Sequence, residues 1–146
     1  MATVQDILAT KSSKVLTTRP DATVLDAINK MNEHRVGALV VTDGDHVVGM
    51  FTERDVLRKV ATSDRPPTAM YVQEVMTQEV VCTGPKEDID EVRTVMMNRR
   101  FRHLPVCDEL TGCLLGLISI GDLNAHDASH REAHIHFLNE YIYGRA

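Results

Sequence analysis

The sequence contains no tryptophan, and only 4% of its 146 residues are aromatic. So few flat rings argue against a surface that stacks the bases of single-stranded nucleic acid. The formal net charge of −5 likewise argues against nucleic-acid binding driven by charge. No apolar run approaches the roughly 20 residues that a membrane span requires, and the N-terminus lacks the basic-then-apolar pattern of a signal peptide. We therefore expect a cytoplasmic protein that binds neither membranes nor nucleic acid.

Cysteine is also scarce, and its spacing excludes a disulfide framework. The chain has three cysteines, Cys82, Cys107 and Cys113, without a C-x-x-C pair. An odd number of cysteines in a chain of this kind favours reduced, mostly buried side chains. A metal- or redox-responsive protein that uses these cysteines together with the C-terminal histidines is the alternative.

Motifs for catalysis are missing as well. The sequence has neither of the glycine-rich phosphate-binding motifs G-x-G-x-x-G and G-x-x-x-x-G-K-[ST], and it has no G-x-S-x-G elbow. No nucleophile, base and orienting carboxylate can be assembled from it. We predict that the protein is not an enzyme and has no catalytic cofactor, and we rank an enzyme with an unrecognised site last.

What the sequence does show is an internal repeat. Segments of the first half recur 65 positions later, and 67 positions later beyond a two-residue insertion near residues 108–112. The matched pairs are residues 18–20 with 83–85, 38–41 with 103–106, and 52–55 with 119–122. A copy of about 60 residues buries little core alone, so the two copies should pack face to face.

Each copy predicts the same order of elements. In the first copy, a short strand at 15–17 precedes a helix at 23–33 whose apolar residues recur at i, i+3, i+4 and i+7. Apolar runs at 36–41 and 47–51 flank an Asp-Gly pair, which is a strong hairpin signal. Thr52 then opens a second helix.

The repeat predicts an α/β fold. Each copy forms a small β-sheet with two helices packed on it, and a pseudo-two-fold axis relates the copies and creates two equivalent clefts. We assign repeat 1 to residues 4–62, a linker to 63–70, repeat 2 to 71–125 and a C-terminal amphipathic helix to 126–146.

The C-terminal segment has two notable patterns. Apolar side chains at helical spacing predict a dimer contact, and they are Ile135, Leu138, Tyr141 and Ile142. His126, His130 and His134 recur every four residues, as imidazoles that share a zinc ion can do. We interpret these histidines as a polar helix face and predict no metal site.

The motif [ST]-x-x-D is the sharpest chemical feature, and it occurs as Thr52-x-x-Asp55 and as Ser119-x-x-Asp122. Each copy follows a strand and opens a helix, whose N-terminus attracts phosphate. A carboxylate at this place can accept bonds from two ribose hydroxyls. The alternative is plain helix capping, for which S/T-x-x-E is the signature.

Nearby cations could offset phosphate charge. Arg54 lies within the first motif, and Arg102 and His103 precede the matched strand of the second copy. Because Gly37 and Ala38 occupy the positions of Arg102 and His103 in the first copy, the two clefts should differ in phosphate preference.

Taken in order, these motifs resemble the cystathionine-beta-synthase (CBS) domain pair family over residues 4–125. The resemblance rests on residues 35–41 and 48–55 in the first copy, and on 75–77, 102–106 and 115–123 in the second. Residues 137–144 look like the tail of small stand-alone bacterial members.

The resemblance implies an adenosyl ligand in the clefts: AMP foremost, or ADP, ATP, NAD or S-adenosylmethionine. It implies that Asp55 and Asp122 hold the ribose and that Thr52 and Ser119 approach the phosphate. It places the adenine against Val15, Thr18, Gly37 and Ala38 in one copy and against Val80, Thr83, His103 and Pro105 in the other. Cys82, at the position of Thr17, departs from the first copy. We therefore expect a homodimeric sensor that signals ligand state to an effector protein.

Overall fold

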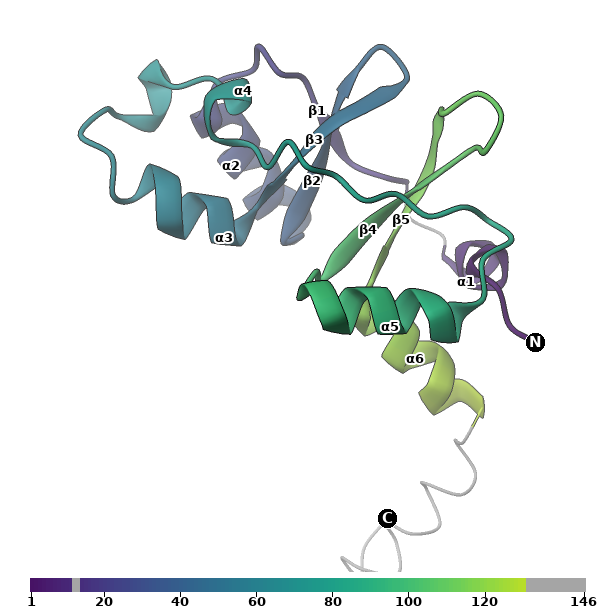
Figure 1. Cartoon of the computed structure of the whole chain (residues 1–146). Coiled ribbons are helices and arrows are strands. Elements are labelled where there is room, and N and C mark those ends of the chain that lie inside the picture. Colours follow the sequence, from purple (N-terminus) through teal and green to yellow (C-terminus); the bar gives the residue numbers. More distant parts are fainter. Residues whose placement is uncertain (12–13, 131–146) are drawn as a thin grey trace, which may run out of the picture.

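The computed structural model describes residues 1–11 and 14–130. Its elements in chain order are α1 (Val4–Thr10), β1 (Thr17–Thr18), α2 (Val24–His34), β2 (Ala38–Asp43), β3 (His46–Thr52), α3 (Glu53–Asp55), η1 (Val56–Val60), η2 (Pro67–Ala69), α4 (Val72–Val75), α5 (Ile89–Arg99), β4 (His103–Cys107), β5 (Leu114–Ser119) and α6 (Ile120–His130). Figure 1 shows two groups of elements with their hairpins side by side, each group built mainly from one repeat. The α/β fold with a small sheet and helices in each repeat is confirmed.

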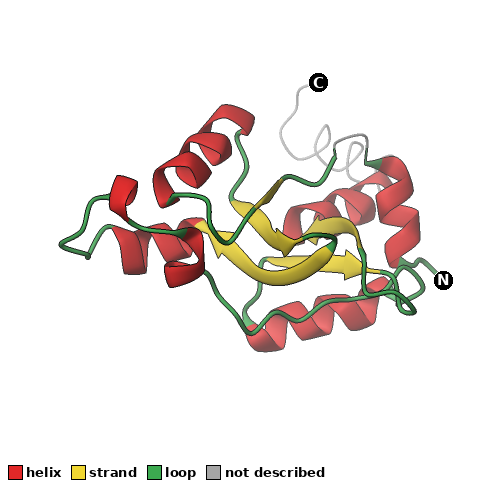
Figure 2. Cartoon of the chain, turned by 90° about the horizontal axis from the view of Figure 1, so that it is seen from above, coloured by secondary structure: helices red, strands yellow, loops and turns green. Residues whose placement is uncertain are grey.

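Both predicted hairpins form, and their registers match. β2 pairs antiparallel with β3, with Ala38 opposite Thr52, and β4 pairs with β5, with His103 opposite Ser119. Figure 2 shows the strands of both sheets in the middle of the molecule, with helices around them. Each register therefore brings the start of one strand beside the hydroxyl that opens the following helix.

The two sheets differ in size for a local reason. The first has the order β1-β2-β3, and in it Val40 N–H donates to the Leu16 carbonyl oxygen at 3.2 Å. In the second repeat Pro105 takes the position of Val40, and proline has no N–H to donate. Within the described part of the chain, Thr83 joins β4 through an isolated parallel bridge to Val106, and the sheet is reduced to β4-β5.

The short helix that begins each repeat packs on the other repeat. Val4 and Ile7 of α1 are buried in the core of the second repeat, and Val72 and Val75 of α4 are buried in the core of the first. Figure 1 shows this exchange, with the purple α1 among green elements and the teal α4 beside blue ones. The repeat alignment, which counts residues 4–10 with the first copy, did not predict it.

Backbone hydrogen bonds hold the exchanged helices in matching ways. Val4 N–H donates to the Glu87 carbonyl oxygen at 2.9 Å, and Val72 N–H donates to the Ala22 carbonyl oxygen at 2.9 Å. In each case the helix start is tied to the segment that leads into the main helix of the other repeat. The two repeats therefore share backbone as well as side-chain contacts.

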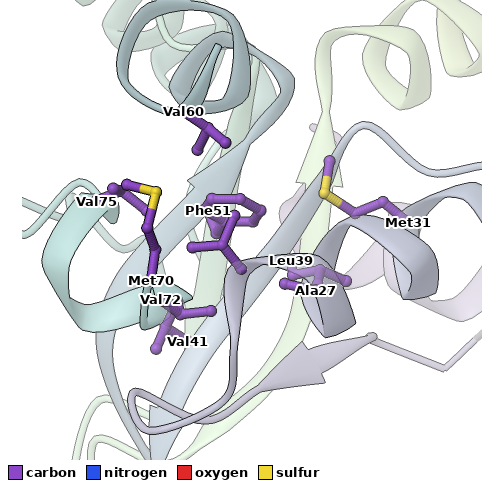
Figure 3. Packing of buried hydrophobic residues seen from close by; sticks show 10 residues of the cluster. Ala27, Met31, Leu39, Val41, Phe51, Val60, Met70, Val72 and Val75 are labelled. Atoms are coloured by element: carbon purple, nitrogen blue, oxygen red, sulfur yellow. The ribbon is translucent and has the colours of Figure 1, made fainter. Parts of the chain in front are cut away.

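The first core gathers side chains from all the elements around it. Figure 3 shows Phe51 of β3 at its centre, with Met70 and Val75 on one side and Met31 of α2 on the other. Phe51 is fully buried, and Met31 is 5% exposed. The helical spacing of apolar residues predicted this buried face of α2 correctly.

A third apolar cluster joins the two sheets. Ala38, Val40 and Met50 of the first sheet are buried, and Leu114 and Leu117 of β5 pack against them. This cluster is the shared interior that the repeat predicted. The dimer contact and the helix predicted beyond residue 130, by contrast, lie outside the described residues and stay predictions.

The exchanged packing predicts that alanine substitution at two matched glycines lowers the stability of the protein by different amounts. A Cβ at Gly49 would lie 2.6 Å from the Met76 sulfur and 3.0 Å from the Thr77 carbonyl oxygen, whereas one at Gly116 would lie 2.7 Å from Leu8 Cδ2, a side-chain end that can turn aside. Gly49→Ala should therefore lower the free energy of unfolding by about 1–3 kcal/mol, and Gly116→Ala by less. Denaturant unfolding of both variants measures this, and a larger loss at Gly116 would contradict the packing.

Candidate functional site

Both [ST]-x-x-D motifs form helix caps. Asp55 N–H donates to Thr52 Oγ1 at 3.3 Å, and Thr52 N–H donates back to Asp55 Oδ2 at 3.0 Å. Asp122 N–H donates to Ser119 Oγ at 3.1 Å, and Ser119 N–H donates to Asp122 Oδ2 at 2.8 Å. These reciprocal bonds are capping boxes. They also fix the direction of each carboxylate, so capping and ligand binding do not exclude each other.

Protein groups occupy both oxygens of the Asp55 carboxylate. Its side chain is 5% exposed, and Lys59 Nζ lies 3.2 Å from Oδ1. The Thr77 hydroxyl donates to Oδ1 at 3.1 Å, and the Thr52 hydroxyl donates to Oδ2 at 3.2 Å. Each oxygen thus has its own partners, as a buried carboxylate requires. In this conformation Asp55 has no oxygen to offer a ligand.

The Asp122 carboxylate is open by comparison. Its side chain is 23% exposed, and its bonds from Lys11 Nζ and Ser119 N–H, each 2.8 Å long, both end on Oδ2. Among the described residues no hydrogen bond ends on Oδ1. Burial would raise the pKa of Asp122, but the bonds from Lys11 and Ser119 outweigh it and hold this pKa below its ordinary value. Asp122 is therefore ionised, and its side chain is partly exposed.

Lys11 is the cation at this carboxylate, and it follows directly after α1. Its ammonium group donates to Asp122 Oδ2 and, at 2.7 Å, to the Leu117 carbonyl oxygen. An ammonium group carries three protons, so one remains for an anion. The helix exchange brings Lys11 here, and for this reason the sequence analysis did not identify Lys11.

The first cleft lies beside Asp122 and has a volume of about 940 Å³. It combines a wall from the first repeat with the capping box of the second. The predicted residues that line it are Val15, Gly37, Ala38, His103, Ser119 and Asp122. Lys11, Lys14 and His34 also line it, so cations and potential cations gather around an apolar wall.

The second cleft lies beside Asp55 and is smaller, with a volume of about 520 Å³. Here the capping box comes from the first repeat and the wall from the second. The predicted residues that line it are Gly37, Thr52, Arg54, Asp55, Val80, Arg102, His103 and Pro105. Arg100 adds a further cation, and Glu53 and Glu79 add anions. This cleft is therefore narrower and more mixed in charge.

Two predicted contact residues do not line the clefts. Among the described residues that line them, neither Thr18 nor Thr83 occurs. Thr18 is 9% exposed and pairs with Val41 within the sheet. Leu16 and Thr17, which precede Thr18, line the first cleft, and Val80 and Val81 line the second. A contact of Thr18 or Thr83 with a bound ligand stays a prediction.

His103 lines both clefts. Burial, followed by the charge of Arg102, lowers the pKa of His103, and the charges of Asp122 and Glu53 oppose this shift in part. The imidazole is therefore neutral at neutral pH in the free protein. It can donate or accept a hydrogen bond toward either cleft without adding a charge.

Thr77 was missed as a site residue, although it belongs to the segment 75–77 on which the family resemblance rests. Its hydroxyl bonds Asp55, and it lines the second cleft. Its backbone pairs with Met50 in both directions, at 2.9 Å and 2.8 Å. A signal for Thr77 was thus present in the motif, but the repeat alignment gave it no role.

The metal alternative concerns the cysteines and the C-terminal histidines, and the structure describes only part of these side chains. Within residues 1–11 and 14–127, no group of three or more His, Cys, Asp or Glu side chains is arranged to hold a metal ion. His134 lies outside the described residues. In the same ranges no helix has the length and the apolar character to cross a membrane.

Comparisons with known proteins agree with this architecture. A profile of the CBS domain matches residues 4–62 and 72–128. The mitochondrial CBS domain-containing protein CBSX3 of Arabidopsis thaliana is 34% identical, with 97% of this chain and 72% of that protein covered. A crystal structure of a protein with CBS domains from Burkholderia ambifaria MC40-6, assigned provisionally to signal transduction, has a TM-score of 0.82 at 42% identity and covers 88% of this chain and 95% of that one.

A more distant structure shows likeness of fold alone. The CBS domain pair of protein MJ0100, in complex with 5-methylthioadenosine and S-adenosyl-L-methionine, has a TM-score of 0.77 at 21% identity. The match covers 89% of this chain and 98% of that one.

The position of His103 predicts a pH dependence of stability. Because its pKa is lower in the folded protein than the ordinary 6.5, the unfolded state takes up the proton first as the pH falls. Stability should therefore decrease as the pH drops from about 6.5 toward the folded pKa, and His103→Gln should remove part of this decrease. Arg102→Gln should raise the titration midpoint of His103 in NMR spectra. A midpoint above 6.5 in the unsubstituted free protein would contradict the assignment.

Proposed function

The chain belongs to the CBS domain family, and we propose that it is a regulatory module that binds an adenosyl ligand between its two repeats and signals to a partner protein. The proposal is carried by one observation: Asp122, ionised and fixed by its capping box, has an oxygen free to accept hydrogen bonds at the edge of a large cleft. Small-molecule sites commonly have volumes of roughly 300–1,000 Å³, and the first cleft falls within that range.

The ribose is the part of the ligand that Asp122 recognises in this proposal. A ribose presents two neighbouring hydroxyl donors, and an ionised carboxylate is an acceptor without donors of its own. Ser119 and Lys11 already hold Oδ2, so Oδ1 keeps its direction when a ligand arrives. Little side-chain freedom is then lost on binding.

An anionic group on the ligand completes the recognition. Lys11 has one proton left for it, and the Ser119 hydroxyl, which accepts from Asp122 N–H, can donate to it. Charge-assisted bonds of this kind favour a phosphate, so we place AMP first among AMP, ADP, ATP, NAD and S-adenosylmethionine. The adenine then lies against Val15 and Gly37, and the bound ligands of the MJ0100 domain pair support an adenosyl ligand.

The two clefts are not equivalent in this proposal. Asp122 offers a free oxygen, whereas Thr77 and Lys59 occupy the matching oxygen of Asp55. A ligand in the second cleft would have to displace them from a buried carboxylate, at a cost in free energy. The first cleft is therefore the site that fills at low ligand concentration.

The remaining parts of the proposal concern output. We propose a homodimer that passes ligand state to an effector protein in the cytoplasm, because ligand binding between two repeats can bias the angle between them. The relatives reported above are described by their domains or by signal transduction, which supports regulation over catalysis.

Titration calorimetry with AMP, ATP, NAD and S-adenosylmethionine tests the ligand and the cleft together. Asp122→Asn keeps an oxygen for the capping bond but loses the charge and replaces the free acceptor with a donor. It should raise the Kd for AMP about tenfold or more, whereas Asp55→Asn should leave this Kd within about twofold. The reverse pattern would contradict the choice of cleft. If none of the four ligands binds, the motifs are helix caps alone.

The role of Lys11 can be tested by comparing two ligands. Lys11→Met should weaken AMP binding about tenfold but leave adenosine binding nearly unchanged, because adenosine carries no anion for the ammonium group to meet. Lys86→Met is the matched control, since Lys86 is exposed and lines neither cleft. Equal losses for AMP and adenosine would show that Lys11 only maintains the structure.

A further inference from the structure

Cys82 and Cys107 lie beside each other at the edge of the second sheet. Thr83 pairs with Val106 in a parallel bridge, and Cys107 N–H donates to the Thr83 carbonyl oxygen at 2.9 Å. Cys82 and Cys107 are the neighbours of the two bridged residues and therefore lie on the same face of the sheet, diagonally across the bridge. A disulfide between them requires the two sulfurs to approach to about 2.0 Å.

This thiol pair distinguishes the second repeat from the first. The matching positions of repeat 1 hold Thr17 and Thr42, whose hydroxyls cannot be oxidised to a cross-link. The same fold position therefore carries two hydroxyls in one repeat and two thiols in the other.

The backbone around Cys82 can adjust to a cross-link. In the first repeat the Val40–Leu16 bond adds a third strand to the sheet. Pro105 cannot make the equivalent bond, and Thr83 is tied to β4 by bonds to Pro105 and from Cys107, each 2.9 Å long. A disulfide tolerates a limited range of geometry, and a segment held this lightly can move into it.

Exposure gives the two thiols different roles. Cys82 is exposed, so an oxidant in solution reaches it first, whereas Cys107 is half-buried. Burial and the contact with Cys82 raise the pKa of Cys107 to about 12. Because the thiolate is the reactive form, the raised pKa keeps Cys107 from reacting with the oxidant before Cys82 does.

We propose that Cys82 and Cys107 form a reversible intramolecular disulfide when the protein meets hydrogen peroxide. The Cys82 thiolate first attacks a peroxide oxygen; the O–O bond breaks, and a sulfenic acid and water result. The Cys107 sulfur then attacks the Cys82 sulfur, the S–O bond breaks, and the hydroxyl leaves as water with the Cys107 proton. The two thiols lose two electrons, and one peroxide is reduced to two waters.

The disulfide would change the second cleft and leave the first unchanged. Val80 and Val81, just before Cys82, line the second cleft, and Leu104 and Pro105 line it from β4. A bond between Cys82 and Cys107 fixes the spacing of these two walls. None of these four residues lines the first cleft, so the proposal is independent of whether an adenosyl ligand binds there.

The test uses Cys113→Ser protein, which lacks the third thiol and keeps the proposed pair. Treatment with a molar equivalent of hydrogen peroxide should consume both thiols, and peptide mapping without reductant should find Cys82 joined to Cys107 in monomeric protein. Dithiothreitol should restore both thiols. The matched variant Cys107→Ser, in the same background, should stop at a Cys82 sulfenic acid that dimedone labels.

The rate of disulfide formation provides a second measurement. Because Cys107 reacts as its thiolate, disulfide formation from the sulfenic acid should accelerate as the pH rises above neutral. Cross-links between molecules, an oxidised Cys82 that persists beside an intact Cys107, or a bond to Cys113 in the unsubstituted protein would each overturn the proposal.

Discussion

Each core is completed by the short helix that begins the other repeat, and the chemistry of both clefts depends on this exchange. α1 ends beside the second repeat and delivers Lys11 to Asp122. α4 ends beside the first repeat and leads to Thr77, which bonds Asp55. Because both helices are anchored by buried valines and by backbone bonds, these contacts follow from the packing of the fold.

A nearly symmetric backbone thus carries two chemically different sites. The exchanged segments supply a cation to one carboxylate and a hydroxyl to the other. Within the repeats, Gly37 matches Arg102 and Val40 matches Pro105. The first substitution moves positive charge toward the second cleft, and the other removes a strand from its wall. His103 lines both clefts, so its imidazole is shared by the two sites.

The sequence predicted what depends on short-range order. Apolar spacing located α2, the Asp-Gly pair located the first hairpin, and the [ST]-x-x-D spacing located both caps. It could not predict the exchange, because the apolar residues of α1 indicate that the helix packs on a core but not on which repeat. Lys11 was missed for the same reason. The resemblance named Thr18 as a ligand contact, and its place beside Val41 in the sheet depends on strand pairing that the sequence alone does not show.

The exchange also sets the order in which the protein can fold during synthesis. α1 is made before the other described elements, but the core that buries it includes Leu123, which is made more than a hundred residues later. The first core waits for Val72 and Val75, so it cannot close when repeat 1 alone has emerged. The first core can therefore close once Val75 has emerged, about halfway through synthesis, whereas α1 waits for the second core until Leu123 has been made.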